Sequence, residues 1–298
     1  MPIGREPPQE RPRRFHGGGP VNELLSVALR CARDAAAVHR EHLGRVEISD
    51  WSQKGVADFV THVDRAAESV IVEHIRAHFP EHRLLAEEDA AERGDRTGVT
   101  REAGDDAWTW IIDPLDGTTN YLHGYPAYAV SIGVARGATL EAAVVLNSAS
   151  GEEWTALRNG GAFRDGDRIS VSQMTELSHT LIGTGFPFKS LHLLPAYTRQ
   201  LAAVLRATSG VRRAGSAALD LCHVATGWFD GFWELDLAPW DVAAGTLIVR
   251  EAGGLVTRLD GAADVLGHGS VLAGSASVHA ALGRIVRAAA AATGTVDA

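Results

Sequence analysis

The chain has 298 residues, of which 45% are apolar and 22% charged, with a formal net charge of −9. That length is enough for two domains with a buried core. The acidic balance argues against direct nucleic-acid binding or general membrane-surface binding, which need a basic face, and no apolar run is long enough for a membrane span.

Residues 1–20 differ in composition from the rest. They hold five of the eleven prolines, a glycine triplet and several arginines, without apolar periodicity. This composition predicts a disordered tail. The segment also lacks the apolar core of a secretory signal.

The first half of the remaining chain has the pattern of helices followed by a sheet. Apolar residues at helical spacing predict helices over 21–43 and 64–79. Strand-like runs follow, and the stretch NGGAFRDGD has the composition of hairpin turns. Together they indicate an α+β arrangement. The predicted strands are 83–86, 108–112, 129–135, 140–146, 153–157 and 168–171.

The second half alternates between the two kinds of element, which favours an α/β layer. We therefore predict an α+β domain over 21–155 and an α/β domain over 156–298. Cys31 and Cys222 fall in apolar helical patterns, which predicts reduced core residues and a cytoplasmic location. The predicted strands are 180–184, 211–214, 229–235, 255–259 and 271–273, and the predicted helices are 193–207, 216–226, 242–252 and 277–291.

Acidic residues stand at the ends of apolar elements in four short stretches, where a fold can bring them together. The stretches are ADFVTHVD with Asp64, LLAEED with Glu87, IIDPLDGTT with Asp113 and Asp116, and PWDVAAG with Asp241. Clustered carboxylates repel one another and raise each other's pKa values unless a cation lies between them. Oxygen ligands without interleaved His or Cys suit Mg²⁺, Mn²⁺ or Ca²⁺ rather than zinc.

The stretch IIDPLDGTT also contains a turn that can hold a phosphate. Its spacing lets Asp113 and Asp116 both reach the same pair of metal ions, and the carbonyl of Leu115 between them offers a further oxygen. Gly117 permits a close backbone approach, and if a helix begins at this turn, its free N–H groups form an anion site. A cation site beside an anion site indicates phosphate chemistry.

Each of these acids also has an ordinary structural explanation. Asp64 and Asp241 are well placed to cap helices, Glu87 to end a strand in solvent, and the DPLDGTT stretch to form an Asx turn. Taken singly, these explanations are the commoner ones. The order of the four stretches and their apolar contexts together favour the metal-site interpretation.

Two longer segments resemble a known family. IIDPLDGTTNYLHGYP and PWDVAAGTLIVREAGG are similar to the two signature segments of the inositol monophosphatase family, which comprises magnesium-dependent, lithium-sensitive phosphatases. The resemblance runs from about residue 21 to about residue 290. It implies a five-layer αβαβα sandwich of the inositol monophosphatase and fructose-1,6-bisphosphatase type, and a homodimer.

The resemblance also implies a role for each matching residue, with two or three Mg²⁺ ions per subunit and Mn²⁺ as a substitute. Asp64 matches an aspartate associated with a third, more weakly bound metal, and Lys54 matches a lysine on a mobile loop near the site. The implied metal ligands are Glu87, Asp113, the Leu115 carbonyl, Asp116, Asp241 and Asp64. The implied substrate contacts are Asp116, Gly117, Thr118, Ala217, Glu234 and Asp241. Where the family has glycine before its paired glutamates this chain has Ala86, which removes no ligand.

The hypothesis is hydrolysis of a small phosphomonoester by water activated at the metal site. Glu87, Thr118 and Asp64 are the predicted catalytic residues: Glu87 and Thr118 orient the water, and Asp64 holds Thr118 or binds the third ion. No Ser, Cys or His nucleophile constellation is present in the sequence, so no covalent intermediate is expected.

The residues leave the substrate open. Inositol 1-phosphate is favoured because FWELDLAPWD and GFPFK look like the general bacterial type of the family. Fructose 1,6-bisphosphate, histidinol phosphate, NADP and adenosine 3′,5′-bisphosphate are alternatives with the same chemistry. A different class is a regulatory protein that associates with RNA or transcription through partners, for which the arginines of the tail are the only feature in favour.

Overall fold

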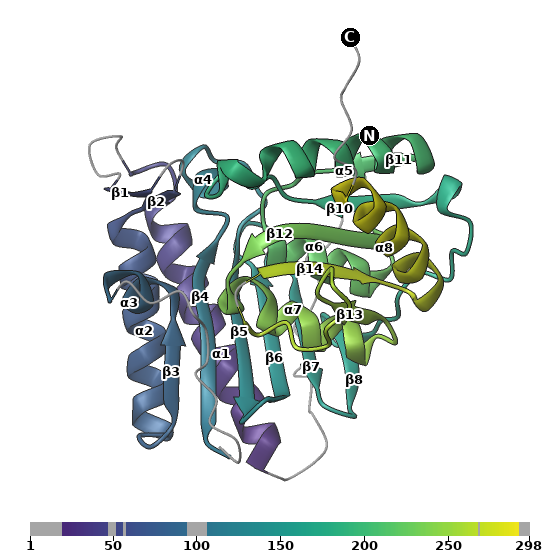
Figure 1. The fold of residues 1–298 in the computed structure, drawn as a ribbon. Coiled ribbons are helices and arrows are strands. Elements are labelled where there is room, and N and C mark those ends of the chain that lie inside the picture. Colours follow the sequence, from purple (N-terminus) through teal and green to yellow (C-terminus); the bar gives the residue numbers. More distant parts are fainter. Residues whose placement is uncertain (1–19, 47–51, 56–57, 94–105, 268, 292–298) are drawn as a thin grey trace, which may run out of the picture.

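The computed structural model describes residues 20–46, 52–55, 58–93, 106–267 and 269–291, and these form alternating layers of helix and sheet (Figure 1). One outer layer is α1 and α2, the middle layer is α6 and α7, and the other outer layer is α5 and α8. A seven-stranded sheet and a five-stranded sheet lie between them. This is the expected five-layer αβαβα sandwich, and the fold prediction is confirmed.

The helices and strands have the following bounds. The α-helices are α1 (Pro20–His42), α2 (His62–His78), α3 (Glu87–Glu92), α4 (Thr118–Leu122), α5 (Leu194–Ala207), α6 (Ala217–Thr226), α7 (Pro239–Glu251) and α8 (Ala276–Ala291). The strands are β1 (Ser52–Gly55), β2 (Asp58–Val60), β3 (Arg83–Ala86), β4 (Trp108–Asp116), β5 (Ala129–Arg136), β6 (Thr139–Asn147), β7 (Glu153–Leu157), β8 (Gly161–Arg164), β9 (Asp167–Arg168), β10 (Leu181–Thr184), β11 (Gly210–Arg212), β12 (Gly231–Leu237), β13 (Leu255–Thr257) and β14 (Gly269–Gly274).

The large sheet keeps its strands in chain order from β3 to β9. Only β3 and β4 are parallel; every later pair is antiparallel, and α4 lies in the connection between β4 and β5. The hairpin is formed by β7 and β8, so the GAFR part of NGGAFRDGD, expected to belong to the turn, is itself a strand. Of the strand expected at 168–171 only Arg168 lies in a strand, as the end of β9. The small sheet has the order β11-β10-β12-β14-β13 and mixes parallel with antiparallel pairs.

Side-chain size on β5 explains how the layers pack against the large sheet. Val130, Ile132 and Val134 alternate along the strand and join the core under α1 and α2. The opposite face carries small residues such as Gly133, where a Cβ atom would lie 2.9 Å from that of Ala243 on α7. The absence of a side chain at Gly133 therefore lets the middle layer approach the strand closely.

Two short helices and one helix start differ from the predictions. The helix expected at 242–252 begins at Pro239, because proline suits the first turn of a helix and the N–H groups there need no partner. The short helix α3 was not predicted, and a helix at Thr118, the start of α4, was considered only as a condition for anion binding. At six and five residues both helices are too short for a periodic pattern to be recognised.

Several other expectations can be placed on the structure. Cys31 and Cys222 are free and buried, as predicted. The division at residues 155/156 stays a prediction, and the large sheet itself continues to Arg168. Among the described residues no helix is long and apolar enough to cross a membrane. The tail of residues 1–20, apart from Pro20 at the start of α1, and the side chain of Lys54 lie outside the described residues.

Candidate active site

The predicted site residues come together around one pocket of about 260 Å³, where the end of β4 meets the middle layer and the small sheet. Ten residues were predicted for the site, and among them only Asp64 does not line the pocket. The lining residues among the predicted ones are Glu87, Asp113, Leu115, Asp116, Gly117, Thr118, Ala217, Glu234 and Asp241. Side chains separated by more than 150 residues in the chain thus face one cavity.

The strand β4 delivers the two aspartates of the DPLD stretch. The register of β4 with β5 shifts between Asp113 and Asp116, so the strand is irregular where Pro114 interrupts it. Asp113 is 1% exposed and accepts a hydrogen bond from the backbone N–H of Leu115 at 3.0 Å. The irregularity turns both carboxylates toward the pocket, which a regular strand would not do for residues three apart.

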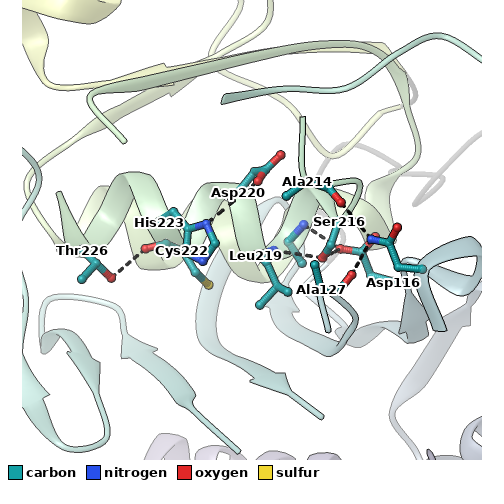
Figure 2. Close-up of polar contacts among 11 residues, drawn as sticks. Asp116, Ala127, Ala214, Ser216, Leu219, Asp220, Cys222, His223 and Thr226 are labelled. Carbon is teal, nitrogen blue, oxygen red and sulfur yellow. Dashed lines mark hydrogen bonds and ion pairs between the residues drawn. The ribbon is translucent and has the colours of Figure 1, made fainter. Parts of the chain in front are cut away.

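Asp116 is fixed by the start of α6 (Figure 2). One of its oxygens accepts hydrogen bonds from the Ser216 hydroxyl at 2.6 Å and from the Ala218 backbone N–H at 2.8 Å. Ser216 is also the N-cap of α6, where its hydroxyl accepts from the N–H of Leu219. Ser216 was not predicted as a site residue. Its place before a helical pattern was the available signal.

The turn after Asp116 depends on Gly117. This residue has φ +92°, and a Cβ atom there would lie 2.8 Å from the carbonyl oxygen of Ala127. Glycine is therefore required both for the backbone conformation and for the close approach. The helix α4 begins at the next residue, Thr118, so the turn and the start of the helix both line the pocket.

Asp64 reaches the pocket through Thr118. Its Oδ1 accepts from the Thr118 hydroxyl at 3.0 Å, and its Oδ2 accepts from the backbone N–H and the hydroxyl of Thr61 at 2.9 and 2.7 Å. Thr61 is the N-cap of α2, and Asp64 completes its capping box and holds Thr118 at the same time. Of the two roles weighed from the sequence, the geometry of the described residues supports the holding of Thr118.

The second half of the chain adds Asp241, Glu234 and Ala217. Asp241 is the third residue of α7 and accepts from the backbone N–H of Ala238 at 2.7 Å. Glu234 lies on β12 with its carboxylate against Gly185, where a Cβ atom would come within 1.9 Å of Oε1. A side chain at position 185 would therefore displace Glu234.

The pocket is also lined by four residues that were not predicted as site residues. Phe186, Phe188 and Lys189 belong to the GFPFK segment, and Arg213 precedes α6. The Arg213 guanidinium lies 5.1 Å and 4.9 Å from the centres of the Phe186 and Phe188 rings, within range of cation–π attraction. These side chains place positive and aromatic groups at the outer end of an acidic pocket.

The pocket carboxylates hold protons more tightly than ordinary acids. Burial raises the pKa of Asp116 to about 6, although hydrogen bonds from Ser216 and Ala218 oppose the rise. Burial also raises the pKa of Asp241 to about 7, and the nearby Glu87 and Asp116 add to it. The pKa of Asp113 is raised well above its usual range by burial and then by Glu87, Asp116 and Asp241.

These properties fit a hard divalent cation. The donors are oxygens from four carboxylates and one carbonyl, and their mutual repulsion is what a cation between them would relieve. Among the described residues no group of three or more His, Cys, Asp and Glu side chains lies in an arrangement that could hold a metal ion, so the carboxylates would have to move toward a cation to bind it. One oxygen of Asp116 and one of Asp241 are held by helix starts, which leaves the opposite oxygens for a cation to gather.

Comparison with known proteins gives one family. The family model of the inositol monophosphatase family matches residues 21–291. A Nus factor SuhB from Pseudomonas aeruginosa is 42% identical over 264 residues, 88% of this chain and 95% of that protein. An inositol-1-monophosphatase from Mesorhizobium japonicum is 41% identical over 264 residues, 89% of this chain and 96% of that protein.

Solved structures agree with this result. The structure of inositol monophosphatase from Anabaena is 37% identical and superposes with a TM-score of 0.76, covering 90% of this chain and 96% of that one. The structure of the extragenic suppressor protein SuhB from Bartonella henselae is 36% identical with a TM-score of 0.78, covering 89% and 98%. The resemblance read from the two signature segments is thereby confirmed, and the chain belongs to the inositol monophosphatase family.

Proposed function

We propose that this protein is a magnesium-dependent phosphomonoesterase that hydrolyses a small sugar or polyol phosphate, with inositol 1-phosphate as the preferred substrate. The observation that carries the proposal is the meeting of Glu87, Asp113, Asp116 and Asp241 in one pocket with the Gly117 turn. The family supports phosphatase chemistry, and the relative named inositol-1-monophosphatase supports the substrate.

The residues of the chain have distinct parts in the proposed reaction. Glu87, Asp113, the Leu115 carbonyl, Asp116 and Asp241 would hold Mg²⁺, with Asp64 as the ligand of a third ion or as the partner of Thr118. When bound, Mg²⁺ supplies a more acidic water and stabilises negative charge on phosphate and leaving group. The N–H groups of the Gly117–Thr118 turn bind phosphate oxygens.

The remaining residues orient water and substrate. The Thr118 hydroxyl donates to Asp64 at 3.0 Å, so its oxygen has a fixed position from which it can accept a hydrogen bond from the water. Glu87 would accept the second hydrogen bond from that water. Ala217 and Glu234 line the pocket and would contact the hydroxyls of a polyol.

The test is phosphate release from a panel of substrates, with Mg²⁺ and with chelator. The panel holds inositol 1-phosphate, fructose 1,6-bisphosphate, histidinol phosphate, adenosine 3′,5′-bisphosphate and NADP. We expect Mg²⁺-dependent release that is fastest for inositol 1-phosphate and is inhibited by lithium. Faster phosphate release from another member of the panel would change the assigned substrate and leave the assigned reaction unchanged. The absence of release from every member would overturn the proposal.

A second candidate function rests on the names of relatives. Several, including the one from Pseudomonas aeruginosa, are named Nus factor SuhB. We keep the alternative of a regulatory protein that associates with RNA or transcription through partners. The test is to look for co-purifying partners of the full chain and of a chain without residues 1–20. If the shortened chain loses its partners and keeps its catalysis, the regulatory role belongs to the tail. The homodimer and the cytoplasmic location are further proposals.

A further inference from the structure

One buried carboxylate outside the pocket contacts the segment that carries Glu87. Glu68 on α2 is 8% exposed, and its two oxygens accept hydrogen bonds from two successive backbone N–H groups. Oε2 accepts from Glu88 at 2.9 Å, and Oε1 accepts from Asp89 at 3.0 Å. These are the second and third residues of α3, so Glu68 occupies the place that an N-cap side chain normally takes.

The N-cap position of α3 itself provides no such group. It is Ala86, the last residue of β3, and no side chain there caps the helix. Ala86 is 1% exposed and Glu88 is 4% exposed, so the backbone between them is largely buried. Without Glu68, the N–H groups of Glu88 and Asp89 would lose their side-chain acceptor. The cap therefore comes from a residue about twenty positions earlier in the chain.

Glu68 lies one helical turn after Asp64, on the same face of α2. Asp64 accepts from Thr118, and Glu68 accepts from the start of α3, whose first residue is Glu87. The helix that carries both acids is anchored in the core by Ala67 and Ile71, which are fully buried. A single rigid helix thus holds the two segments that bear Thr118 and Glu87.

We propose that Glu68 is a positioning residue for the metal site, which fixes the start of α3 and so places Glu87 at the pocket. The inference rests on the proposed function. Partners of metal ligands in the surrounding structure typically change metal affinity by about 10- to 100-fold when they are removed. A cap that only stabilised the fold would leave metal affinity unchanged.

The chain offers a matched control for that distinction. Glu251 also accepts from two backbone N–H groups, those of Asn159 and Gly161, both at 2.8 Å. It fixes the turn between β7 and β8, and neither it nor its partners line the pocket. Glu251→Ala therefore removes the same kind of contact where no metal ligand depends on it.

The experiment measures Mn²⁺ binding to the full chain by electron paramagnetic resonance, together with thermal unfolding. We expect Glu68→Ala to weaken Mn²⁺ binding by about 10-fold or more. Glu68→Gln should weaken it less, since the amide keeps one acceptor oxygen, and this variant decides the question if Glu68→Ala fails to fold. Glu251→Ala should lower the unfolding temperature and leave Mn²⁺ affinity within about twofold of the unchanged chain.

Three results would count against the inference. Mn²⁺ affinity that is unchanged in both Glu68 variants, or that falls equally in Glu251→Ala, overturns the positioning role and leaves the proposed function standing. The absence of Mn²⁺ binding by the unchanged chain overturns the proposed function instead, and this inference with it. The Mg²⁺ concentration at half-maximal phosphate release gives a second readout, which should rise in Glu68→Gln.

Discussion

At the scale of single residues, Asp113 is the most deeply buried of the four pocket carboxylates. Burial and three neighbouring carboxylates raise its pKa well above the usual value, and a bound cation would offset both effects. Asp113→Asn removes its charge and keeps its shape. We expect turnover to fall on the order of 10³-fold, because a metal ion supplies several kcal/mol of charge stabilisation. The unfolding temperature should hold, since Trp110 and Ile112 keep β4 in the core.

The control for that variant is Asp230→Asn. Asp230 is also buried, but it accepts from the Leu181 backbone N–H and does not line the pocket. The turnover of Asp230→Asn per folded molecule should stay within a few-fold of that of the unchanged chain. Near-normal phosphate release by Asp113→Asn, measured with saturating Mg²⁺, would contradict the assignment of Asp113 as a ligand.

The Gly117 turn gives a prediction on backbone strain. Gly117→Ala should destabilise the protein by about 2 kcal/mol or more, because a Cβ atom is unfavourable at positive φ and collides with the Ala127 carbonyl. Gly253 has a similar φ of +87° with open space around its Cβ position, so Gly253→Ala reports the cost of φ alone. Urea unfolding of both variants measures the difference, and equal losses would show that the collision at Gly117 is relieved.

At the scale of elements, the site depends on how helix starts meet strand ends. The start of α6 holds Asp116 through Ser216 and Ala218, and the start of α7 holds Asp241 through Ala238. Asp116 thus adds to the Ser216 cap of α6, Asp241 lies in the first turn of α7, and the positive end of each helix stabilises their charge. A shift of either helix along its axis would therefore change the position or the contacts of one pocket carboxylate.

Ser216→Ala tests the junction of β4 and α6. It removes the N-cap of α6 and one of the two bonds to Asp116, so we expect a stability loss of about 1–2 kcal/mol and weaker Mg²⁺ binding. Ser275 accepts from the Val278 backbone N–H at the start of α8 and binds no carboxylate in the described residues. Ser275→Ala should lower stability without a change in Mg²⁺ binding, as measured by calorimetry. Similar Mg²⁺ binding in both variants would contradict a role for Ser216 in the site.

At the scale of the whole molecule, the pocket costs stability when no cation is bound. The pKa values of Asp116, Asp241 and Glu234 are raised by burial to about 6, 7 and 8. In the unfolded chain these acids ionise near pH 4. Between about pH 4 and pH 8 the folded state therefore binds more protons than the unfolded state, and stability falls as pH rises through this window.

The unfolding temperature of the protein in chelator should consequently decrease from pH 5 to pH 8. Mg²⁺ should restore it, with the largest gain at the high end, since the cation replaces the lost protons. Differential scanning calorimetry at several pH values, with and without Mg²⁺, measures both effects. The same slope in Asp116→Asn as in the unchanged chain would show that other groups control the pH dependence.

The sequence by itself determined which residues are chemically special and which elements are long enough to have a period. The helix α2 and the long strands of the large sheet follow from apolar spacing, because a face buried in the core must repeat with the period of its backbone. Acids at the ends of apolar runs marked Glu87, Asp113, Asp116 and Asp241, because an ordinary fold seldom places charge there.

The tertiary structure alone decided how these residues meet. The short helices α3 and α4 have no recognisable period, and their positions come from contacts with distant residues such as Glu68 and Asp64. The contacts of Ser216 with Asp116 and of Glu68 with α3 could not be predicted either, since a hydroxyl or a carboxylate gives no local sign of a partner that is distant in the sequence. The physical reason is that hydrophobic periodicity is a local property of the chain, whereas a buried polar group is satisfied by whichever donor the packing of the layers brings to it.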